Sequence, residues 1–192
     1  MSLDSVRDWI RALEEAGELT RVKAEVDPRL EIAAITDRVS KEEGAPNRAL
    51  LFEKVKGSAL PVLINAFGSR RRCALALGVE RVEEHADRIR ALLDQAPPEG
   101  LLDKIRMLPK LAEMASWSPK KVGSAPCQEV VLEGADVDLG RLPVLTTWPQ
   151  DAGPFITFPL CITKDPESGR RNVGTYRLQV FSRNETGFHT HL

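Results

Sequence analysis

Apolar residues recur every three to four positions near the start of the chain, and this spacing predicts a helix. The apolar face of this helix consists of Val6, Trp9, Ile10 and Leu13. Gly17 follows as a stop signal, and the segment LTRVKAEV at 19–26 then alternates between apolar and polar residues. Because that alternation is typical of a half-buried strand, the chain is predicted to open with a helix followed by a strand.

A second helix and a pair of strands are predicted next. Asp27-Pro28 opens the helix, whose apolar residues keep helical spacing until Gly44-Ala45-Pro46 closes it. Two apolar runs follow, ALLFEKV at 49–55 and LPVLINAF at 60–67. The turn residues between these runs favour two paired strands.

Two further helices complete the first part of the chain. Ser69 is a plausible N-cap for the first of them. The segment VERVEEHADRIRALLDQ at 79–95 has the apolar stripe of an amphipathic helix. Residues up to about position 95 are therefore predicted to form a small α/β layer.

A polar linker then marks a domain boundary. Helical spacing resumes around Pro109 and gives way to SPKKVGSAP at 118–126, which has the composition of an interdomain segment. We place the boundary near residue 120. The sequence thus predicts an N-terminal α/β domain at 1–119 and a second domain at 120–192.

The second domain is predicted to be built from strands. CQEVVLEG at 127–134 and FITFPLCIT at 155–163 each predict a strand. The 20-residue connection between them, 135–154, is long for a compact domain, and such loops are more often functional or packed. KDPESGRR at 164–171 carries Asp-Pro and Ser-Gly turn signals between two β runs, so a hairpin is predicted there.

Composition narrows the function classes. The 192 residues are 42% hydrophobic and 29% charged, which is ordinary for a globular protein. The net charge of −1 gives no overall field that would attract nucleic acid. Since no run approaches the ~18 apolar residues of a membrane span, and the charged N-terminus is unlike a secretory leader, we expect a soluble, cytoplasmic protein.

The end of the chain, RRNVGTYRLQVFSRNETGFHTHL, concentrates versatile polar side chains in strand-like sequence. Strand alternation places Asn172 and Arg177 on opposite faces, unless the register breaks between them, and Gly174 could supply that break. His189 and His191 would share a face at a spacing that suits metal ligation. The residues alone allow three interpretations of this segment: a metal site, a phosphate-contacting strand and a solvated edge strand.

The second half of the chain resembles the UbiD family of reversible decarboxylases. The motifs WPQDAGPFIT, DPESG, NVGTYR and TG occur in consistent order within LPVLTTWPQDAGPFITFPLCITKDPESGRRNVGTYRLQVFSRNETGFHTHL. The resemblance implies an α+β fold, in which an N-terminal α/β domain is followed by part of an antiparallel, flavin-binding split β-barrel. It also implies prenylated FMN as cofactor, with a divalent ion such as Mn²⁺ and K⁺ at its phosphate.

The resemblance assigns roles to individual residues. Asn172 would bind the metal through its side-chain carbonyl, since hard cations accept oxygen ligands. Arg177 would be catalytic, because its guanidinium can orient and stabilise the reacting carboxylate. The residues expected to contact the flavin are Thr175, Tyr176, Arg177, His189, Thr190 and His191. The metal-binding histidine of the family would fall just after Leu192, with His191 as the alternative.

The implied reaction is non-oxidative decarboxylation, or its reverse, of an aromatic or α,β-unsaturated acid such as a prenylated 4-hydroxybenzoate. The family's proton-transferring carboxylates lie far downstream, so the 192-residue chain alone is expected to be inactive. The alternatives are a non-catalytic β module for flavin or metal binding or assembly, and a plain histidine-based metal protein. Unpaired strand edges predict either a homo-oligomer, as we expect, or a disordered C-terminal tail.

Overall fold

The computed structural model describes residues 3–94 and 120–189, and between them residues 100, 109, 111, 112, 114–116 and 118. The chain forms two compact units. The first combines Met1–Arg81 with Gly134–Leu192, and the second comprises Val82–Glu133. The first unit contains both the α/β layer and the C-terminal strands.

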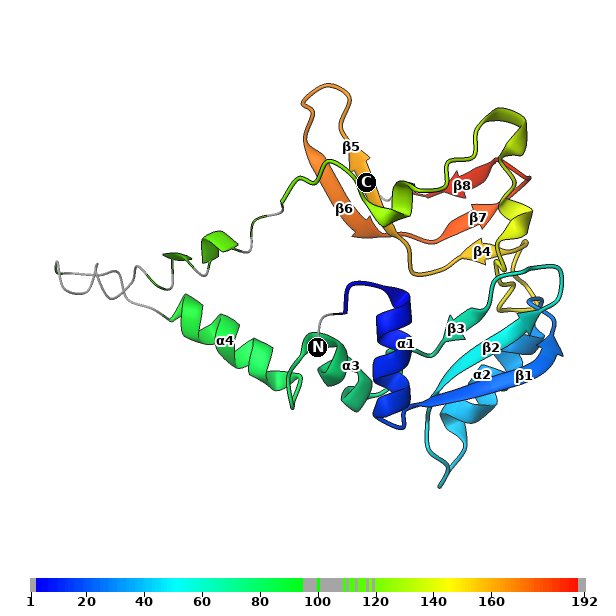
Figure 1. The fold of residues 1–192 in the computed structure, drawn as a ribbon, viewed down its shortest axis with the longest axis horizontal. Helices are drawn as coiled ribbons and strands as arrows, with labels where there is room; N and C mark the ends of the chain where they lie inside the picture. The colour runs from blue at the N-terminus through cyan, green and yellow to red at the C-terminus, as the bar shows by residue number, and fades with distance from the viewer. Residues whose placement is uncertain are drawn as a thin grey trace. The chain divides into compact units, whose positions relative to one another are not determined.

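The α/β layer is organised around a three-stranded sheet. Its strands are β1 (Leu19–Val26), β2 (Ala49–Val55) and β3 (Val62–Ile64). They lie in the order β1-β2-β3, with β1 parallel and β3 antiparallel to β2 (Figure 1). Because parallel neighbours need a crossover, the chain passes through α2 (Glu31–Lys41) between β1 and β2.

Helices cover both faces of this sheet. Leu50 and Phe52 of β2 pack with Ile32 of α2 in one apolar cluster. Ala49 of β2 packs with Leu13 of α1 (Val6–Glu15) in a second cluster, which also includes residues of α3 (Arg70–Leu77). The alternation of side chains along a strand sends successive β2 residues to the two clusters. The central strand is therefore buried on both faces, as its largely apolar sequence requires.

Local signals explain where these helices begin and end. The Ser5 hydroxyl accepts a hydrogen bond from the Asp8 backbone N–H at the start of α1, and Ser69 does the same for Arg72 at the start of α3. Gly17 follows α1 with φ +69°, a conformation that other residues rarely adopt. The predicted cap at Ser69 and the predicted stop at Gly17 are confirmed, whereas α2 begins at Glu31, after Leu30, and not at Asp27-Pro28.

A buried arginine joins α3 to the start of two strands. The Arg72 side chain is fully buried, and its Nη1 lies 2.9 Å from Glu18 Oε2 and 2.6 Å from the Asn47 carbonyl oxygen. Its Nη2 donates to Asn47 Oδ1 at 3.0 Å. Glu18 and Asn47 precede β1 and β2, so this cation connects three elements of the layer.

The C-terminal strands form two small sheets. β4 (Phe155–Ile156), β7 (Leu178–Val180) and β8 (Thr186–Phe188) lie in the order β4-β7-β8, with antiparallel pairing. β5 (Leu160–Lys164) and β6 (Arg171–Thr175) form the predicted hairpin. Leu160 pairs with Thr175 at one end of the ladder, and Lys164 pairs with Arg171 at the other. Mixed helix and strand content is confirmed, and the part of the chain that the structure describes shows small sheets without closing them into a barrel.

A short segment connects the α/β layer to these strands. The Leu145 side chain lies in the apolar cluster with Ile32, and its carbonyl oxygen accepts a hydrogen bond from Phe155 N at 2.9 Å. Thr146 pairs with the chain before α2: its N donates to Pro28 O at 3.2 Å, and its O accepts from Leu30 N at 2.9 Å. The long connection 135–154 is thus packed, and it includes two 3₁₀ turns, Gly134–Asp136 and Leu139–Arg141.

The second unit contains α4 (Glu83–Leu93) and a 3₁₀ turn, Pro126–Gln128. The predicted amphipathic helix is therefore present and begins four residues later than the pattern at 79–95. No residue of α4 is buried, and its apolar Ile89 and Leu93 are exposed. The helical stretch predicted around Pro109 lies mostly outside the described residues.

Two strand predictions are wrong. Residues 127–134 form no strand: the segment starts in the 3₁₀ turn at Pro126, and Val130 and Val131 are exposed without a partner strand to pair with. The run FITFPLCIT is not one strand, because Phe158 has φ +65° and Pro159 follows, which ends β4 and lets β5 start anew.

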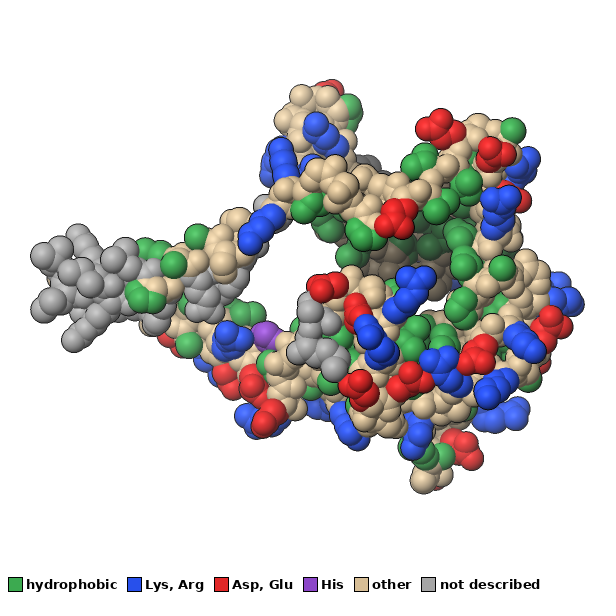
Figure 2. All heavy atoms as spheres, in the orientation of Figure 1, with side chains coloured by type: hydrophobic (Ala, Val, Ile, Leu, Met, Phe, Trp, Pro, Cys, Tyr) green, Lys and Arg blue, Asp and Glu red, His purple; other side chains and the backbone are tan. Residues whose placement is uncertain are grey.

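Surface charge follows the composition. On the face shown in Figure 2, basic and acidic side chains are interspersed over the α/β layer, with no large field of one sign. Within the described ranges, no helix combines the length and the hydrophobicity needed to cross a bilayer.

Replacing Arg72 with alanine is expected to lower the free energy of unfolding by about 3 kcal/mol, because it leaves Glu18 without its buried cation. Urea denaturation measures the loss. Arg71→Ala is the matched control: Arg71 pairs with the same Glu18 from an exposed position, so it should cost less than about 1 kcal/mol. Equal losses in the two variants would show that burial does not matter here.

Candidate functional site

The polar C-terminal sequence lies on β6, β7 and β8, with one irregular step. β6 ends at Thr175 and β7 starts at Leu178, so the break falls at Tyr176-Arg177. The predicted break at Gly174 is wrong, since Gly174 stays in register opposite Cys161. The break nevertheless removes the strict alternation that would hold Asn172 and Arg177 on opposite faces.

Gly174 has a different role: it leaves room for an aromatic ring. A Cβ atom at this position would lie 2.6 Å from Cε2 of Tyr176, closer than side chains pack. The Tyr176 ring also contacts Phe188 of β8, with centroids 4.9 Å apart and planes at 58°. The absence of a side chain at Gly174 therefore lets Tyr176 fold back over β6.

Asn172 contacts this aromatic pair. Its Nδ2 donates to the Tyr176 hydroxyl at 3.3 Å, and its side chain is exposed on β6. Because the amide nitrogen makes this contact, the carbonyl oxygen of Asn172 remains available as an acceptor or cation ligand. The structure thus brings together two of the predicted site residues, Asn172 and Tyr176.

Arg177 is held by a second group of residues, which we call the arginine clamp: Asp151, Thr147 and Phe155. Its Nη1 lies 3.1 Å from Asp151 Oδ1 and its Nη2 lies 2.7 Å from Oδ2, a forked ion pair. Nη2 also lies 3.3 Å from Thr147 Oγ1. The guanidinium carbon sits 3.7 Å from the centroid of the Phe155 ring, which is a cation–π contact.

The loop fixes Asp151 independently of the arginine. Its Oδ2 accepts from the Trp148 backbone N–H at 3.1 Å and from the Thr147 hydroxyl at 3.2 Å. The hydrogen bond from Arg177, assisted by these two, holds the pKa of the Asp151 carboxyl below its usual range. The carboxylate is therefore ionised at neutral pH. Asp151 was missed as a site residue, although it stands in the WPQDAG motif.

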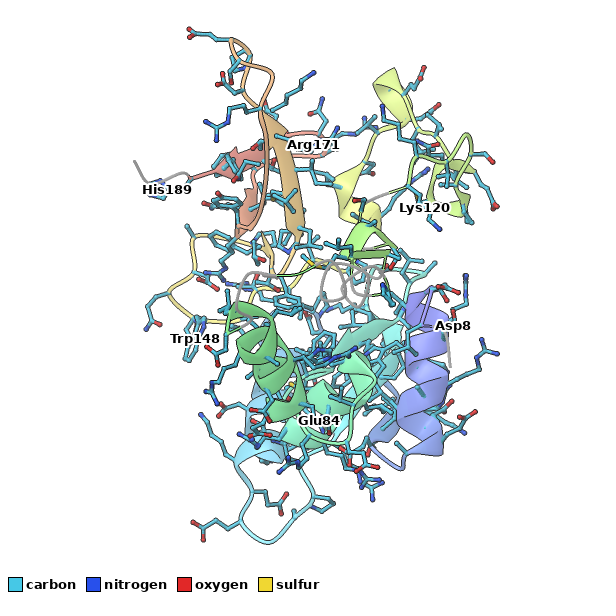
Figure 3. The ribbon with its side chains drawn as sticks, turned by 90° about the vertical axis from the view of Figure 1, so that its left-hand side faces the viewer. Asp8, Glu84, Lys120, Trp148, Arg171 and His189 are labelled. Carbon is cyan, nitrogen blue, oxygen red and sulfur yellow. The ribbon has the colours of Figure 1, made fainter. Side chains whose placement is uncertain are left out.

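The remaining predicted residues lie at the ends of strands. Thr175 is exposed at the end of β6, opposite Leu160. His189, labelled in Figure 3, follows β8 directly, and the same view labels Trp148 in the clamp loop. Thr190 and His191 lie outside the described residues. No hydrogen bond joins Asn172 to Arg177, so in the described structure they belong to two separate groups.

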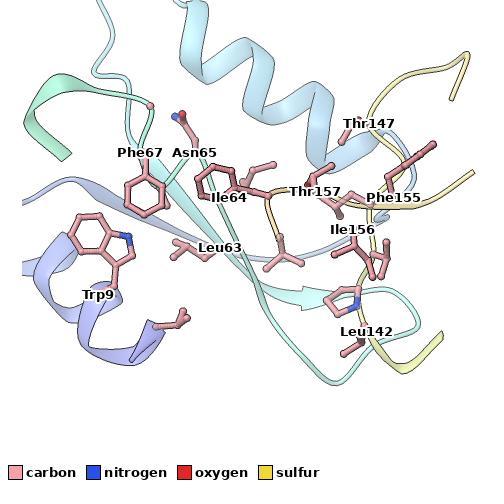
Figure 4. A pocket seen from close by; sticks show the side chains of 18 residues that line it. Trp9, Leu63, Ile64, Asn65, Phe67, Leu142, Thr147, Phe155, Ile156 and Thr157 are labelled. Atoms are coloured by element: carbon pink, nitrogen blue, oxygen red, sulfur yellow. The ribbon is translucent and has the colours of Figure 1, made fainter. Parts of the chain in front are cut away.

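An apolar pocket of about 810 Å³ lies in the same unit (Figure 4). It is lined by segments 62–68, 142–145 and 155–158, with Val6, Trp9 and Thr147. None of the described residues that line it carries a charge. Thr147 and Phe155 line this pocket and also contact Arg177, so the clamp borders its wall.

No cluster of three or more metal-ligating His, Cys, Asp or Glu side chains occurs where the structure describes the chain. Of the predicted histidine pair, His189 lies in that part and His191 lies outside it.

Comparison with known families decides the classification. Residues 10–92 match the N-terminal domain of 3-octaprenyl-4-hydroxybenzoate carboxy-lyase, and residues 120–192 match the Rift-related domain of the same enzyme family. The chain belongs to the UbiD family. The resemblance inferred from the sequence motifs is thereby confirmed.

Solved UbiD-class structures share the fold. The enzyme HmfF from Pelotomaculum thermopropionicum, in complex with FMN, is 33% identical with a TM-score of 0.70, over 97% of this chain and 36% of that chain. Vanillic acid decarboxylase from Sedimentibacter hydroxybenzoicus, in its closed form, is 30% identical with a TM-score of 0.76, over 100% of this chain and 38% of that chain.

A relative found by sequence is also covered over a little more than a third of its length. An uncharacterized protein of Archaeoglobus fulgidus is 48% identical over 189 residues, which is 98% of this chain and 38% of the relative. The chain thus spans a little over a third of the length of each of these relatives.

Gly174→Ala is expected to displace the Tyr176 ring and to lower the free energy of unfolding by about 1–3 kcal/mol through overpacking. Urea denaturation measures the stability, and the ring-proton shifts of Tyr176, the only tyrosine in the chain, report its contact with Phe188. Gly123→Ala is the control, since a Cβ there meets no atom within 4 Å. Unchanged Tyr176 shifts in Gly174→Ala would contradict the packing account.

The lowered pKa of Asp151 predicts a pH-dependent stability. Because the folded pKa lies below the unfolded value of about 3.9, the stabilisation is complete well above pH 4 and is lost as the pH falls through the folded pKa. Denaturation of the wild type and of Asp151→Asn across a pH series should therefore show a stability difference that shrinks on acidification. When Arg177 is first replaced by glutamine, Asp151→Asn should change the stability less at neutral pH, because the ion pair is already gone. A difference independent of pH would refute the ion pair.

Proposed function

We propose that this chain forms the N-terminal α/β domain, 1–119, and the opening strands of the flavin-binding domain, 120–192, of a decarboxylase that uses prenylated FMN. The observation that carries the proposal is the position of NVGTYR: within six residues it places an exposed amide oxygen, a tyrosine that packs against Phe188, and a forked arginine. The solved relatives include complexes with FMN and with prFMN, which supports the choice of cofactor.

The residues present fit a flat, phosphate-bearing ring. Ligand sites of this kind combine apolar and aromatic surface with a few placed polar groups. Tyr176 and Phe188 supply aromatic surface, while Thr175 ends β6 and His189 directly follows β8. We propose that these residues, together with Arg177, Thr190 and His191, contact the flavin.

The β5–β6 hairpin supports a larger β structure around the site. Three apolar side chains of the hairpin, Leu160, Ile162 and Val173, are between 58% and 73% exposed. Leu160 and Ile162 alternate onto one face of β5, and Val173 lies directly opposite Ile162. A two-stranded hairpin is marginally stable alone, so this apolar face is expected to pack against further strands, as in a split barrel.

A cation near the phosphate would complete the site. The Asn172 carbonyl oxygen is the ligand that we assign to a divalent ion such as Mn²⁺, with K⁺ at the same phosphate. Histidine and carboxylate ligands would come from the residues at or after His191.

Arg177 is the residue that we assign to the substrate. Its guanidinium stays charged at all relevant pH values, and it can orient an aromatic or acrylic carboxylate and stabilise its negative charge. Prenylated FMN, when bound, supplies the electron sink for loss of carbon dioxide. The acid that delivers the proton matches no motif in this chain, so the 192 residues alone are expected to be inactive, and assembly into a homo-oligomer is part of the proposal.

Binding of prenylated FMN tests the proposal. The purified chain with Mn²⁺ is expected to quench flavin fluorescence saturably, and Arg177→Gln to weaken binding about tenfold, the effect of losing one or two charge-assisted hydrogen bonds. Arg171→Gln is the matched control, because Arg171 is an exposed arginine six positions before Arg177, on β6. Absence of flavin binding, or equal effects of both variants, would favour a non-catalytic module. Decarboxylation by the isolated chain would overturn the expected inactivity.

A further inference from the structure

The forked edge of Arg177 is already occupied by a carboxylate of the same chain. Asp151 takes both terminal nitrogens, at 3.1 and 2.7 Å. This is the geometry in which an arginine binds an external carboxylate. An incoming acid therefore meets an arginine whose charge is balanced and whose strongest donors are engaged.

Asp151 is the better anchored member of the pair. Its side chain is only 11% exposed, whereas that of Arg177 is 39% exposed. Its Oδ2 is also held by the Trp148 N–H and the Thr147 hydroxyl. The carboxylate thus stays in place whether or not the arginine contacts it, and Arg177 is the partner that can exchange ligands.

One edge of the guanidinium is left over. Phe155 covers one face at 3.7 Å, and Asp151 and Thr147 accept from the terminal nitrogens. Among the residues that the structure describes, none accepts a hydrogen bond from Nε of Arg177. An external carboxylate can approach this edge, or it can displace Asp151 from the fork.

We propose that Asp151 is a specificity-determining residue, an internal carboxylate that weakens the binding of substrate carboxylates by Arg177. The inference rests on the proposed role of Arg177 and adds a residue that this role did not include. Attraction between the guanidinium and an external anion is offset by repulsion from Asp151, at either edge. Tight binding of the ground-state acid gives no rate advantage, so such a counter-charge suits an enzyme that must bind its acid and release it.

Benzoate titrations of the 192-residue chain test the proposal. The Nε–H signal of Arg177 is followed by NMR in ¹⁵N-arginine-labelled protein and assigned by its loss in Arg177→Gln. Benzoate is expected to shift this signal weakly in the wild type, and Asp151→Asn to bind benzoate about five- to tenfold more tightly, because the opposing charge is gone. Benzamide, which has the same ring without the charge, should bind both proteins equally.

Two variants act as matched controls. Asp165→Asn removes another loop carboxylate, one that accepts hydrogen bonds from Ser168 and from the Glu167 N–H and has no arginine partner, and its benzoate affinity should equal that of the wild type. Thr147→Val removes an acceptor of Arg177 without changing charge, and its affinity should stay within about twofold. A gain in either control equal to that of Asp151→Asn would overturn the proposal.

The remaining outcomes are also decisive. Unchanged or weaker benzoate binding in Asp151→Asn, or no Arg177 shift in any protein, would refute the inference. Should Asp151→Asn fail to fold, Asp151→Ser removes the same charge and keeps an acceptor for Trp148 N–H, and the same gain is expected of it. Flavin binding measured on the same samples separates the two hypotheses. If the wild type does not bind flavin, the proposed function is contradicted, while the benzoate comparison still tests the role of Asp151.

Discussion

The segment Leu145-Thr146-Thr147 is the constraint on which the candidate site depends. Leu145 fills the apolar cluster beside α2, Thr146 pairs with the backbone before α2, and Thr147 contacts Arg177. Successive residues of one extended segment thus reach the core of the α/β layer and the guanidinium. The position of Arg177 is therefore set by packing in the N-terminal half as well as by its own strand.

The same constraint explains how an exposed arginine is kept in one orientation. Surface ion pairs alone contribute little, because side-chain entropy opposes them. Here Asp151 is fixed by two further hydrogen bonds, and the Phe155 ring supports the guanidinium from one face. Phe155 is itself placed by its backbone hydrogen bond to Leu145. Several weak contacts that share one backbone anchor achieve what a single pair would not.

The sequence was informative where a local signal decided the structure. Ser69 caps its helix through a hydrogen bond to Arg72 three residues away, and the Asp-Pro and Ser-Gly turn residues produce the β5–β6 hairpin. The strand prediction at 127–134 is wrong, and no strand pairs with this segment among the residues that the structure describes. Phe158 adopts a positive φ, which cannot be predicted from its residue type. These errors come from tertiary context that no short window contains.

In the candidate site, too, local motifs were recognisable in the sequence, whereas contacts between distant residues were not. Asn172, Tyr176 and Arg177 were recognisable from the NVGTYR motif, and two of them do meet. Their roles toward flavin, metal and substrate stay predictions. The Asp151–Arg177 pair spans 26 positions, and only the folded chain shows that these two charges meet.

The division of the chain into units bears on how family members can be recombined. The first unit is discontinuous, because the second unit, Val82–Glu133, is inserted between its two segments in the sequence. Exchange of that whole stretch between homologues cuts no contact within the first unit. A single crossover between Lys41 and Leu145, by contrast, would pair one parent's Leu145 with the other's α2. Hybrid proteins should therefore inherit the α/β layer and the segment 145–155 from a single parent.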